Sequence, residues 1–268
     1  MGAFVQYGIL YMAKQMGLIL RDPIFLVMVI YSVCVYKRQI ENIRGKLPFK
    51  YLLSAIGQDL VIGILIGAVT SLLLSYKGIY FEVDMNILIL IPIAFILMLI
   101  HPRLGCFSYV IPIAFIIEGG MRLMNKPLYA LNYDMLINLV GILHIIEGLL
   151  VIASGWQHAY SVPIYEDKKL VTYKMMRHIW IVPLFFNLSQ TQTVVPLYAL
   201  LAYGDHAKVR SAQAQSLLTG CLILLFGLTL TLLACYTHPK GLQISGIILL
   251  MPVLHELIFM VEEYCNKK

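Results

Sequence analysis

The chain of 268 residues carries 20 basic and 14 acidic side chains, a net charge of +6, and is 60% hydrophobic and only 13% charged. Globular domains are roughly 45–50% apolar and about 25% charged, so too few polar residues remain here to cover a water-soluble surface. The basic residues gather in a few short segments rather than on a sustained basic face, which excludes a nucleic-acid partner. We expect an all-α fold: a polytopic membrane protein of about seven to eight hydrophobic helical segments, in one integral membrane domain over residues 1–268.

The chain begins with two apolar stretches separated by a turn. Residues 3–20 form an expected helix that polar side chains interrupt, so it is either a poor spanning helix or an interfacial one. Pro23 suits the first position of a helix, where its missing N–H is not needed, and a second helix is expected over 23–36. Five basic residues and a single acidic one follow in the loop 37–50. Basic loops of this kind stay on the cytoplasmic side, and we place this one there.

A long apolar helix is expected over residues 51–76. It carries Gly63 and Gly67, whose four-residue spacing lets another helix approach closely. The loop after it holds Glu82 and Asp84 and is expected outside. Three further spans are expected over residues 86–100, 106–124 and 135–154.

The largest polar segment of the chain covers residues 156–178. Within it, 161–165 and 170–173 are typical of a small extended ribbon that turns at Glu166-Asp167. The segment also holds four basic residues. We therefore place it on the cytoplasmic side together with the loop 37–50.

Residues 179–203 are apolar at both ends but polar in the middle, where Asn187, Gln190 and Gln192 lie. Hydrocarbon offers no partner to amide groups, so such a segment is tolerated only where protein or water meets it. We expect a broken or re-entrant element, with an ordinary inward-facing span as the alternative. A polar, partly hydrated pocket is expected against residues 187–193.

Two apolar helices, 215–236 and 243–263, close the chain. If residues 179–203 are re-entrant, fourteen of the twenty basic residues lie on the cytoplasmic side, whereas a full span would leave ten on each side. The excess of basic residues in cytoplasmic loops favours the first arrangement. We expect a multi-pass protein of the cytoplasmic (inner) membrane with its C-terminus in the cytoplasm.

Ionisable and amide side chains inside apolar segments are costly, which makes them candidates for functional sites. They are Asp59, Glu118, His144, Glu147, Asn187, Gln190, Gln192, His255 and Glu256. The first interpretation is structural, with these groups bonded between helices to fix their packing. A proton relay or substrate pathway is the second. A composite metal site is the third, because imidazole and carboxylate both bind zinc, and it would use His144, Glu147, His255 and Glu256.

No complete catalytic or metal-binding motif is present in the sequence. His255-Glu256 begins like the H-E-x-x-H motif of zinc proteases, but Phe259 stands where the second histidine is required. The five cysteines show no spacing of a metal site or a disulfide framework. Cys106, at the start of an expected helix, is interpreted like the others as a small buried residue. We assign no catalytic residue, no metal and no cofactor.

Three stretches resemble a known family. They are HPRLGCFSYVIPI at 101–113, the run from LHIIEGLLVIASGW through SVPIYEDKKLVTY to HIWIVPL at 143–184, and the closing MPVLHELIFMVEE. They resemble the membrane region of PDZ-containing membrane proteins of Firmicutes (MinJ-like). The resemblance implies membrane anchoring and partner binding, with no catalytic residues. In that family a PDZ domain follows, so we expect either a relative without this domain or a truncated chain.

These observations lead to three expected functions. The first is a non-enzymatic bacterial membrane scaffold or adaptor of the cell-division or envelope type. It would sit in the lipid bilayer and bind other membrane proteins or a second copy of itself. The alternative is a transport or peptide-handling component with a polar site at 187–193, because discontinuous helices with polar centres form transporter sites. A membrane peptidase that uses the histidines and glutamates is the third.

Overall fold

A computed structural model describes residues 17–44, 49–76, 82–83, 85–166, 168–188, 194–237 and 241–267. The chain divides into two compact units, each made of two stretches of sequence. The sheet unit comprises Met1–Val83 and Gly155–Ala207, and the helical unit comprises Asp84–Ser154 and Lys208–Lys268. Each unit is described separately below.

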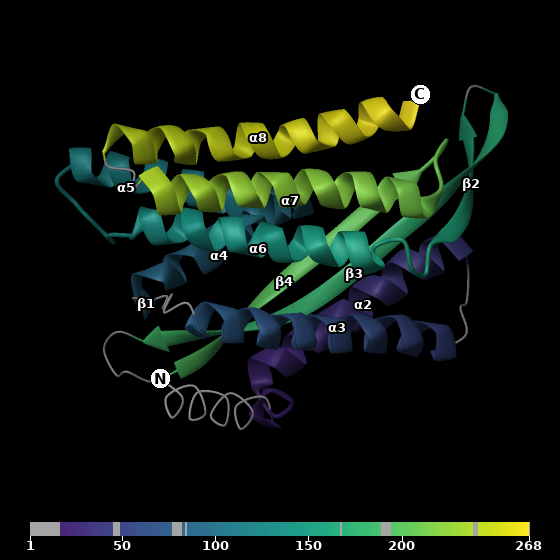
Figure 1. Cartoon of the computed structure of the whole chain (residues 1–268), viewed down its shortest axis with the longest axis horizontal. Helices are drawn as coiled ribbons and strands as arrows, with labels where there is room; N and C mark the ends of the chain where they lie inside the picture. Colours follow the sequence, from purple (N-terminus) through teal and green to yellow (C-terminus); the bar gives the residue numbers. More distant parts are fainter. Residues whose placement is uncertain are drawn as a thin grey trace. The chain divides into compact units, whose positions relative to one another are not determined.

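Among its described residues, the sheet unit combines two long helices with four strands. Its elements are α2 (Pro23–Arg44), α3 (Phe49–Tyr76), β1 (Glu82–Val83), β2 (Tyr160–Glu166), β3 (Lys169–Leu188) and β4 (Val194–Ala207). The long strand β3 pairs antiparallel with both β2 and β4, and parallel with the short β1 (Figure 1). The expected ribbon is confirmed, since Tyr165 pairs with Leu170 in the β2–β3 hairpin.

The expectation of an all-α fold is wrong for residues 160–207. In particular, the segment 179–203 is neither a broken helix nor an ordinary span, because its described parts belong to β3 and β4. The run from Ile179 to Phe186 is rich in β-branched and aromatic residues, which suit a strand. The two strands are antiparallel, so the chain does reverse its direction across this segment.

Helix α3 covers the edge of β3 that β2 and β1 leave open. Asp59 Oδ2 accepts the N–H of Ile179 over 3.0 Å, and Ser71 Oγ accepts the N–H of Phe185 over 3.2 Å. Between these two bonds, Pro183 has no N–H to satisfy. Positions 59, 63, 67 and 71, which share one face of α3, thus lie opposite positions 179, 181, 183 and 185 of β3.

Gly63 and Gly67 make this close approach possible. A Cβ atom at Gly63 would lie 2.5 Å from the carbonyl oxygen of Ile181, and one at Gly67 would lie 2.5 Å from that of Pro183. The predicted role of the small residues is therefore confirmed, but their partner is a strand rather than a helix. An unpaired sheet edge is unfavourable in a membrane, and α3 removes it.

The helical unit contains five α-helices and two short 3-10 turns among its described residues. They are η1 (Met85–Ile89), α4 (Leu90–Ile100), η2 (Pro102–Gly105), α5 (Phe107–Leu123), α6 (Tyr133–Ser154), α7 (Ala212–Thr237) and α8 (Leu242–Lys267). Helices α6, α7 and α8 lie side by side (Figure 1). The predicted ends of these helices differ from the observed ones by a few residues.

Four glycines bring the backbones of α6 and α7 into contact. A Cβ atom at Gly148 would lie 2.6 Å from the backbone nitrogen of Leu224 and 2.8 Å from the carbonyl oxygen of Gly220. One at Gly227 would lie 2.7 Å from the carbonyl oxygen of Gly141. Such packing of small residues replaces the hydrophobic effect as the force that joins helices within a membrane.

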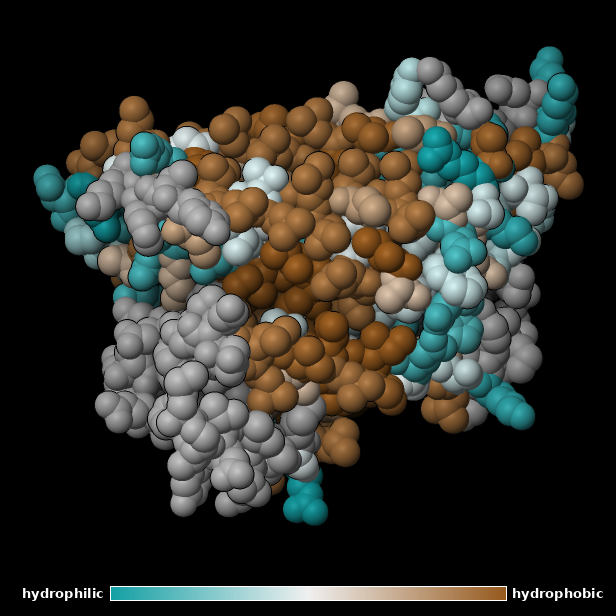
Figure 2. Space-filling view, in the orientation of Figure 1, coloured by the Kyte–Doolittle hydropathy of each residue, from teal (hydrophilic) through white to brown (hydrophobic). Residues whose placement is uncertain are grey.

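The composition of the helices identifies a membrane protein. Among the described residues, four helical segments are long and apolar enough to cross a bilayer: Leu53–Leu74, Tyr133–Ser154, Ala212–Cys235 and Leu242–Asn266. Figure 2 shows a broad hydrophobic surface over the middle of α7 and α8, with polar side chains gathered toward the ends. The predicted number of seven to eight hydrophobic helical segments is not confirmed, because the described residues contain four such spans and one shorter apolar helix, Asn86–Ile100, which includes α4.

Two predicted loops also need correction. Helix α2 begins at Pro23 as predicted but continues to Arg44, so most of the expected loop 37–50 is helical. Most of the expected cytoplasmic segment 156–178 belongs to β2 and β3. Most of the expected first helix and the polar centre at 189–193 lie outside the described residues.

Candidate metal centre

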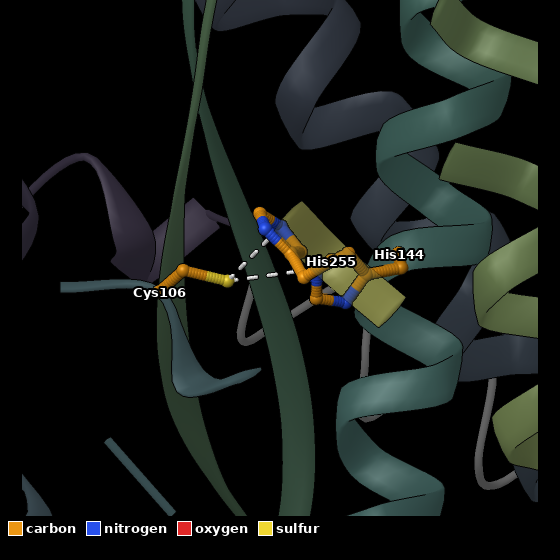
Figure 3. A group of neighbouring side chains, drawn as sticks. All are labelled: Cys106, His144 and His255. Carbon is orange, nitrogen blue, oxygen red and sulfur yellow. Dashed lines mark hydrogen bonds between the residues drawn. The ribbon is translucent and has the colours of Figure 1, made fainter. Parts of the chain in front are cut away.

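Three potential metal ligands from three different helices meet inside the helical unit. They are Cys106 at the start of α5, His144 on α6 and His255 on α8, and their ligand atoms all lie within 4.8 Å of one another. The thiol sulfur is 3.5 Å from His144 Nε2 and 3.8 Å from His255 Nε2 (Figure 3). Both histidines are buried, and the cysteine is half-buried.

Hydrogen bonds at the far side of each ring determine which nitrogen faces the thiol. The Nδ1 of His144 lies 2.8 Å from the carbonyl oxygen of Val140, which can only accept, so Nδ1 carries the proton. Its Nε2 therefore presents a lone pair toward Cys106. Metal-binding histidines are commonly oriented in this way by a backbone carbonyl.

His255 is oriented by a tyrosine and a carboxylate. The hydroxyl of Tyr109 donates its only proton to Glu256 Oε1 over 2.6 Å. Its oxygen then accepts from His255 Nδ1, 3.0 Å away. The Nε2 of His255 is left with a lone pair, as in His144. Two imidazole lone pairs thus converge on one sulfur atom.

The two sulfur–nitrogen distances match those around a tetrahedral zinc ion. Zinc bonds of about 2.3 Å to sulfur and about 2.0–2.1 Å to nitrogen place these two atoms about 3.6 Å apart at tetrahedral angles. The observed separations of 3.5 and 3.8 Å bracket that value. Cys106 is also the N-cap residue of α5, so it lies at the positive end of the helix dipole. Among the described residues the group offers three ligands, and a zinc ion held by three protein ligands keeps a fourth position open, as in catalytic rather than structural sites.

Proton donors for the metal-free state are also present. Ser108 Oγ lies 3.4 Å from His144 Nε2, and the Cys106 thiol can donate to His255 Nε2. The Ser108 contact is long for a hydrogen bond between oxygen and nitrogen. The sulfur–nitrogen distances suit both a hydrogen-bonded cluster and a set of ligands around one metal ion. The Phe226 ring packs edge-on against both imidazoles, with ring centroids 4.9 Å from His144 and 5.7 Å from His255, and closes one side of the cluster.

An ion pair borders the cluster on another side. Arg103 Nη1 lies 3.7 Å from Glu256 Oε2, and its guanidinium stacks 4.0 Å above the centre of the Phe259 ring. The side chains of Arg103 and Glu256 are 43% and 47% exposed, so this side of the cluster is open.

A second polar cluster lies in the sheet unit. Asp59 and His178 are both 2% exposed and form an ion pair with an N–O distance of 2.9 Å. The other ring nitrogen of His178 lies 3.0 Å from the carbonyl oxygen of Gln157. Both nitrogens face atoms that only accept, so a doubly protonated ring satisfies both of them. Tyr36 also donates to Asp59, and Trp180 stacks on the His178 ring with an interplanar angle of 4°.

A short chain of amides connects this pair to His158. The Nε2 of His158 donates to Gln58 Oε1 over 2.7 Å, and Gln58 in turn bonds the Gln157 side chain. Burial lowers the pKa of His158, and the charge of His178 lowers it further, whereas Asp59 raises it. Every described ligand-type group here has a hydrogen-bond partner, so we interpret this cluster as structural.

Glu118 and Glu147, the remaining predicted site residues whose side chains the structure describes, do not join either cluster. Glu118 bonds Arg122, the hydroxyl of Tyr133 and the N–H of Leu131, which ties the segment before α6 to α5. Glu147 is half-buried on α6 outside the metal cluster. The Asn187 backbone belongs to β3, but its side chain and the residues Gln190 and Gln192 lie outside the described part of the structure.

The structure brings together two of the four residues of the sequence-based composite site, His144 and His255. Cys106 lies with them, whereas Glu147 and Glu256 are not members of this group. Sequence spacing could not reveal this cysteine, because it lies 38 and 149 residues from its two partners. Its position at the start of a helix was the one available signal.

Comparisons with protein families, with curated proteins and with solved structures find no match for this chain. The resemblance to PDZ-containing membrane proteins stays a prediction, and the function must be argued from geometry.

Proposed function

We propose that this protein is a membrane-embedded, metal-dependent hydrolase whose centre is a zinc-type ion held by Cys106, His144 and His255. The observation that carries the proposal is the convergence of two imidazole Nε2 atoms on one thiol, each ring oriented by an acceptor at its Nδ1. A thiolate and two neutral imidazoles are a ligand set that zinc prefers over magnesium or calcium.

Hydrolysis is the reaction that this ligand set supports best. A zinc ion with three protein ligands binds a water molecule at the fourth position and makes it a nucleophile at neutral pH. The open side at Arg103 and Glu256 supports access of water and substrate to that position. The scaffold role expected first rests on the sequence resemblance alone. The inner membrane and a cytoplasmic C-terminus are proposed on the excess of basic residues.

Metal content tests the proposal directly. The full chain, purified in detergent without added chelator, should retain about one zinc ion per chain, in keeping with a buried three-ligand site. The Cys106→Ser and His144→Ala variants should lose most of it. Cys221→Ser is the matched control, because Cys221 lies on α7 of the same unit and is exposed. Equal zinc content in all four proteins, or none in any, would refute the metal centre.

Cobalt substitution gives a readout that a merely structural cysteine would not change. Co²⁺ bound by a thiolate produces a sulfur-to-metal charge-transfer band in the near ultraviolet. That band should be present in the wild type and in Cys221→Ser, and should be lost in Cys106→Ser. A band of equal intensity in Cys106→Ser would show that the thiolate ligand lies elsewhere.

A further inference from the structure

The two histidines of the metal centre lie halfway along helices that can span a bilayer. Eleven residues of α6 precede His144 and ten follow it, while thirteen residues of α8 precede His255 and twelve follow it. At 1.5 Å per residue, each histidine is about 15–20 Å from either helix end. The hydrocarbon core is about 30 Å thick, so both rings lie near its middle.

Cys106 lies at the same depth, although it belongs to an interhelical connection rather than to a helix interior. Helix α4 has only 11 residues and ends at Ile100, and α5 begins at Phe107. The two helices pack against each other and run back from this break toward the same end of α6 (Figure 1). The apolar helix before the break, Asn86–Ile100, and the 17 residues of α5 are each shorter than a full span of about 20 residues. The sulfur of Cys106 contacts both histidines, which lie midway along their helices. The α4–η2–α5 segment is therefore a re-entrant pair whose turn, His101–Cys106, lies at mid-depth.

The charged groups at this turn require water. Arg103 and Glu256 are 43% and 47% exposed at a depth where hydrocarbon would surround them. Charged side chains at the bilayer centre face a protein interior or a water-filled cavity. Non-helical backbone at that depth has the same requirement. Water must therefore reach the ion pair of Arg103 and Glu256 beside the metal centre.

We infer that the substrate of this centre is a peptide bond within a transmembrane segment of another polypeptide; this rests on the proposed metal-dependent hydrolase. The hydrolysable ester and phosphoester bonds of phospholipids lie at the interface, about 15 Å from the bilayer centre. The bonds that hydrolysis can break at mid-depth are those of a polypeptide backbone. Water supplies its oxygen and one proton to the carbonyl carbon as a carboxylic acid, the C–N bond breaks, and the amine nitrogen takes the second proton.

Such a substrate needs a local break in its helix. The backbone carbonyl of a regular transmembrane helix is bonded within the helix and shielded by side chains, so it cannot reach a metal ion. Glycine and proline near the middle of the segment would expose it. The centre is expected to select substrates by the depth of that break.

Model peptides of defined depth test this inference. The full chain is reconstituted with zinc into phosphatidylcholine–phosphatidylglycerol vesicles that contain an apolar peptide of about 20 residues with a central Gly-Pro pair. A second peptide carries the pair within one turn of its end, and a third is a water-soluble peptide around the same pair. Mass spectrometry should find cleavage of the first peptide only, at the pair, and none by the His255→Ala variant. Cys221→Ser should cleave like the wild type.

The possible failures are distinguishable from one another. Cleavage of the soluble or the end-placed peptide, or release of fatty acid from the vesicles, would overturn the substrate assignment and leave the hydrolase. No cleavage by protein that holds one zinc ion per chain would overturn the inference while the metal centre stands. Absence of zinc from the same preparation would overturn the proposed function itself.

The re-entrant arrangement has an independent test. In a chain whose cysteines other than Cys106 are replaced by serine, Asn86→Cys and Lys126→Cys should react with an impermeant maleimide from the same side of sealed vesicles. His101→Cys, at the turn, should not react from the opposite side, as it would if 86–100 and 106–124 were two full spans. Gln213→Cys, near the start of α7, and Leu242→Cys, at the start of α8 and a few residues beyond the other end of α7, should react from opposite sides and serve as the spanning control. Reaction of positions 86 and 126 from opposite sides would mean that the segment between them crosses the bilayer, and would contradict the mid-depth position of the metal centre.

Discussion

His178 Nδ1 donates to Asp59 Oδ1 over 2.9 Å, and this pair joins strand β3 to helix α3 in the interior of the sheet unit. Removal of one member of a buried ion pair leaves the other without its counter-charge, which costs about 3–5 kcal/mol. We expect Asp59→Ala and His178→Ala each to lower the free energy of unfolding in detergent by about that amount.

A double-mutant cycle isolates the interaction energy between Asp59 and His178 from the energies of their other contacts. The Asp59→Ala/His178→Ala protein should be more stable than the sum of the two single effects predicts, with a coupling of about 1.5–3 kcal/mol. Single effects that add within about 0.5 kcal/mol would mean that the two side chains do not interact.

The approach of α3 to β3 predicts a sharp difference between two glycines of one helix. Gly63→Ala places a methyl group against the carbonyl of Ile181 and should destabilise the protein by about 1–3 kcal/mol, because backbone cannot move aside as a side chain can. Gly57, in the same helix, has nothing within 4 Å of such a methyl group. Gly57→Ala should therefore be neutral or stabilise by up to about 1 kcal/mol. Equal melting temperatures of the two variants would contradict the helix–strand contact.

The glycine contacts between α6 and α7 should affect metal binding as well as stability. Gly227→Ala pushes against the backbone of Ile145, next to His144, and displaces the neighbouring Phe226 that packs on both imidazoles. We expect a weaker zinc affinity, by about tenfold or more, as for other changes behind a metal ligand. Gly119→Ala on α5, where a methyl group meets open space, is the control and should bind zinc normally. Competition with a zinc-sensitive dye measures both affinities, and equal values would contradict the prediction.

The lowered pKa of His158 predicts a loss of stability in mild acid. The unfolded chain takes up a proton at His158 near its ordinary pKa of about 6.5, before the folded chain does. The contribution of neutral His158 to the free energy of unfolding is therefore fully present above about pH 6.5 and is lost as the pH falls below that value. Between about pH 7.5 and pH 5.5, wild-type protein should lose more stability than His158→Gln, which cannot titrate. Protonation of the metal-binding histidines affects both proteins alike, so parallel curves would contradict the prediction.

The sequence by itself determined the membrane class, the positions of the apolar helices and the β2–β3 ribbon. These features depend on local composition and periodicity: a run of about 20 apolar residues predicts a spanning helix wherever it occurs. The same local information was misleading for Ile179–Phe186. An apolar run with β-branched and aromatic residues suits either a helix or a strand, and the choice depended on Asp59, Ser71 and two glycines of α3, more than 100 residues earlier.

Only the tertiary structure decided the metal centre. The sequence identified His144 and His255 as costly groups inside apolar helices, which is a local property of each residue. It could not identify Cys106 as their partner, because a thiol is an ordinary apolar side chain until other ligands approach it. That approach depends on the re-entrant turn between α4 and α5, which brings the start of a helix to the middle of two others. A contact between residues 38 and 149 positions apart is a property of packing, and no spacing along the chain encodes it.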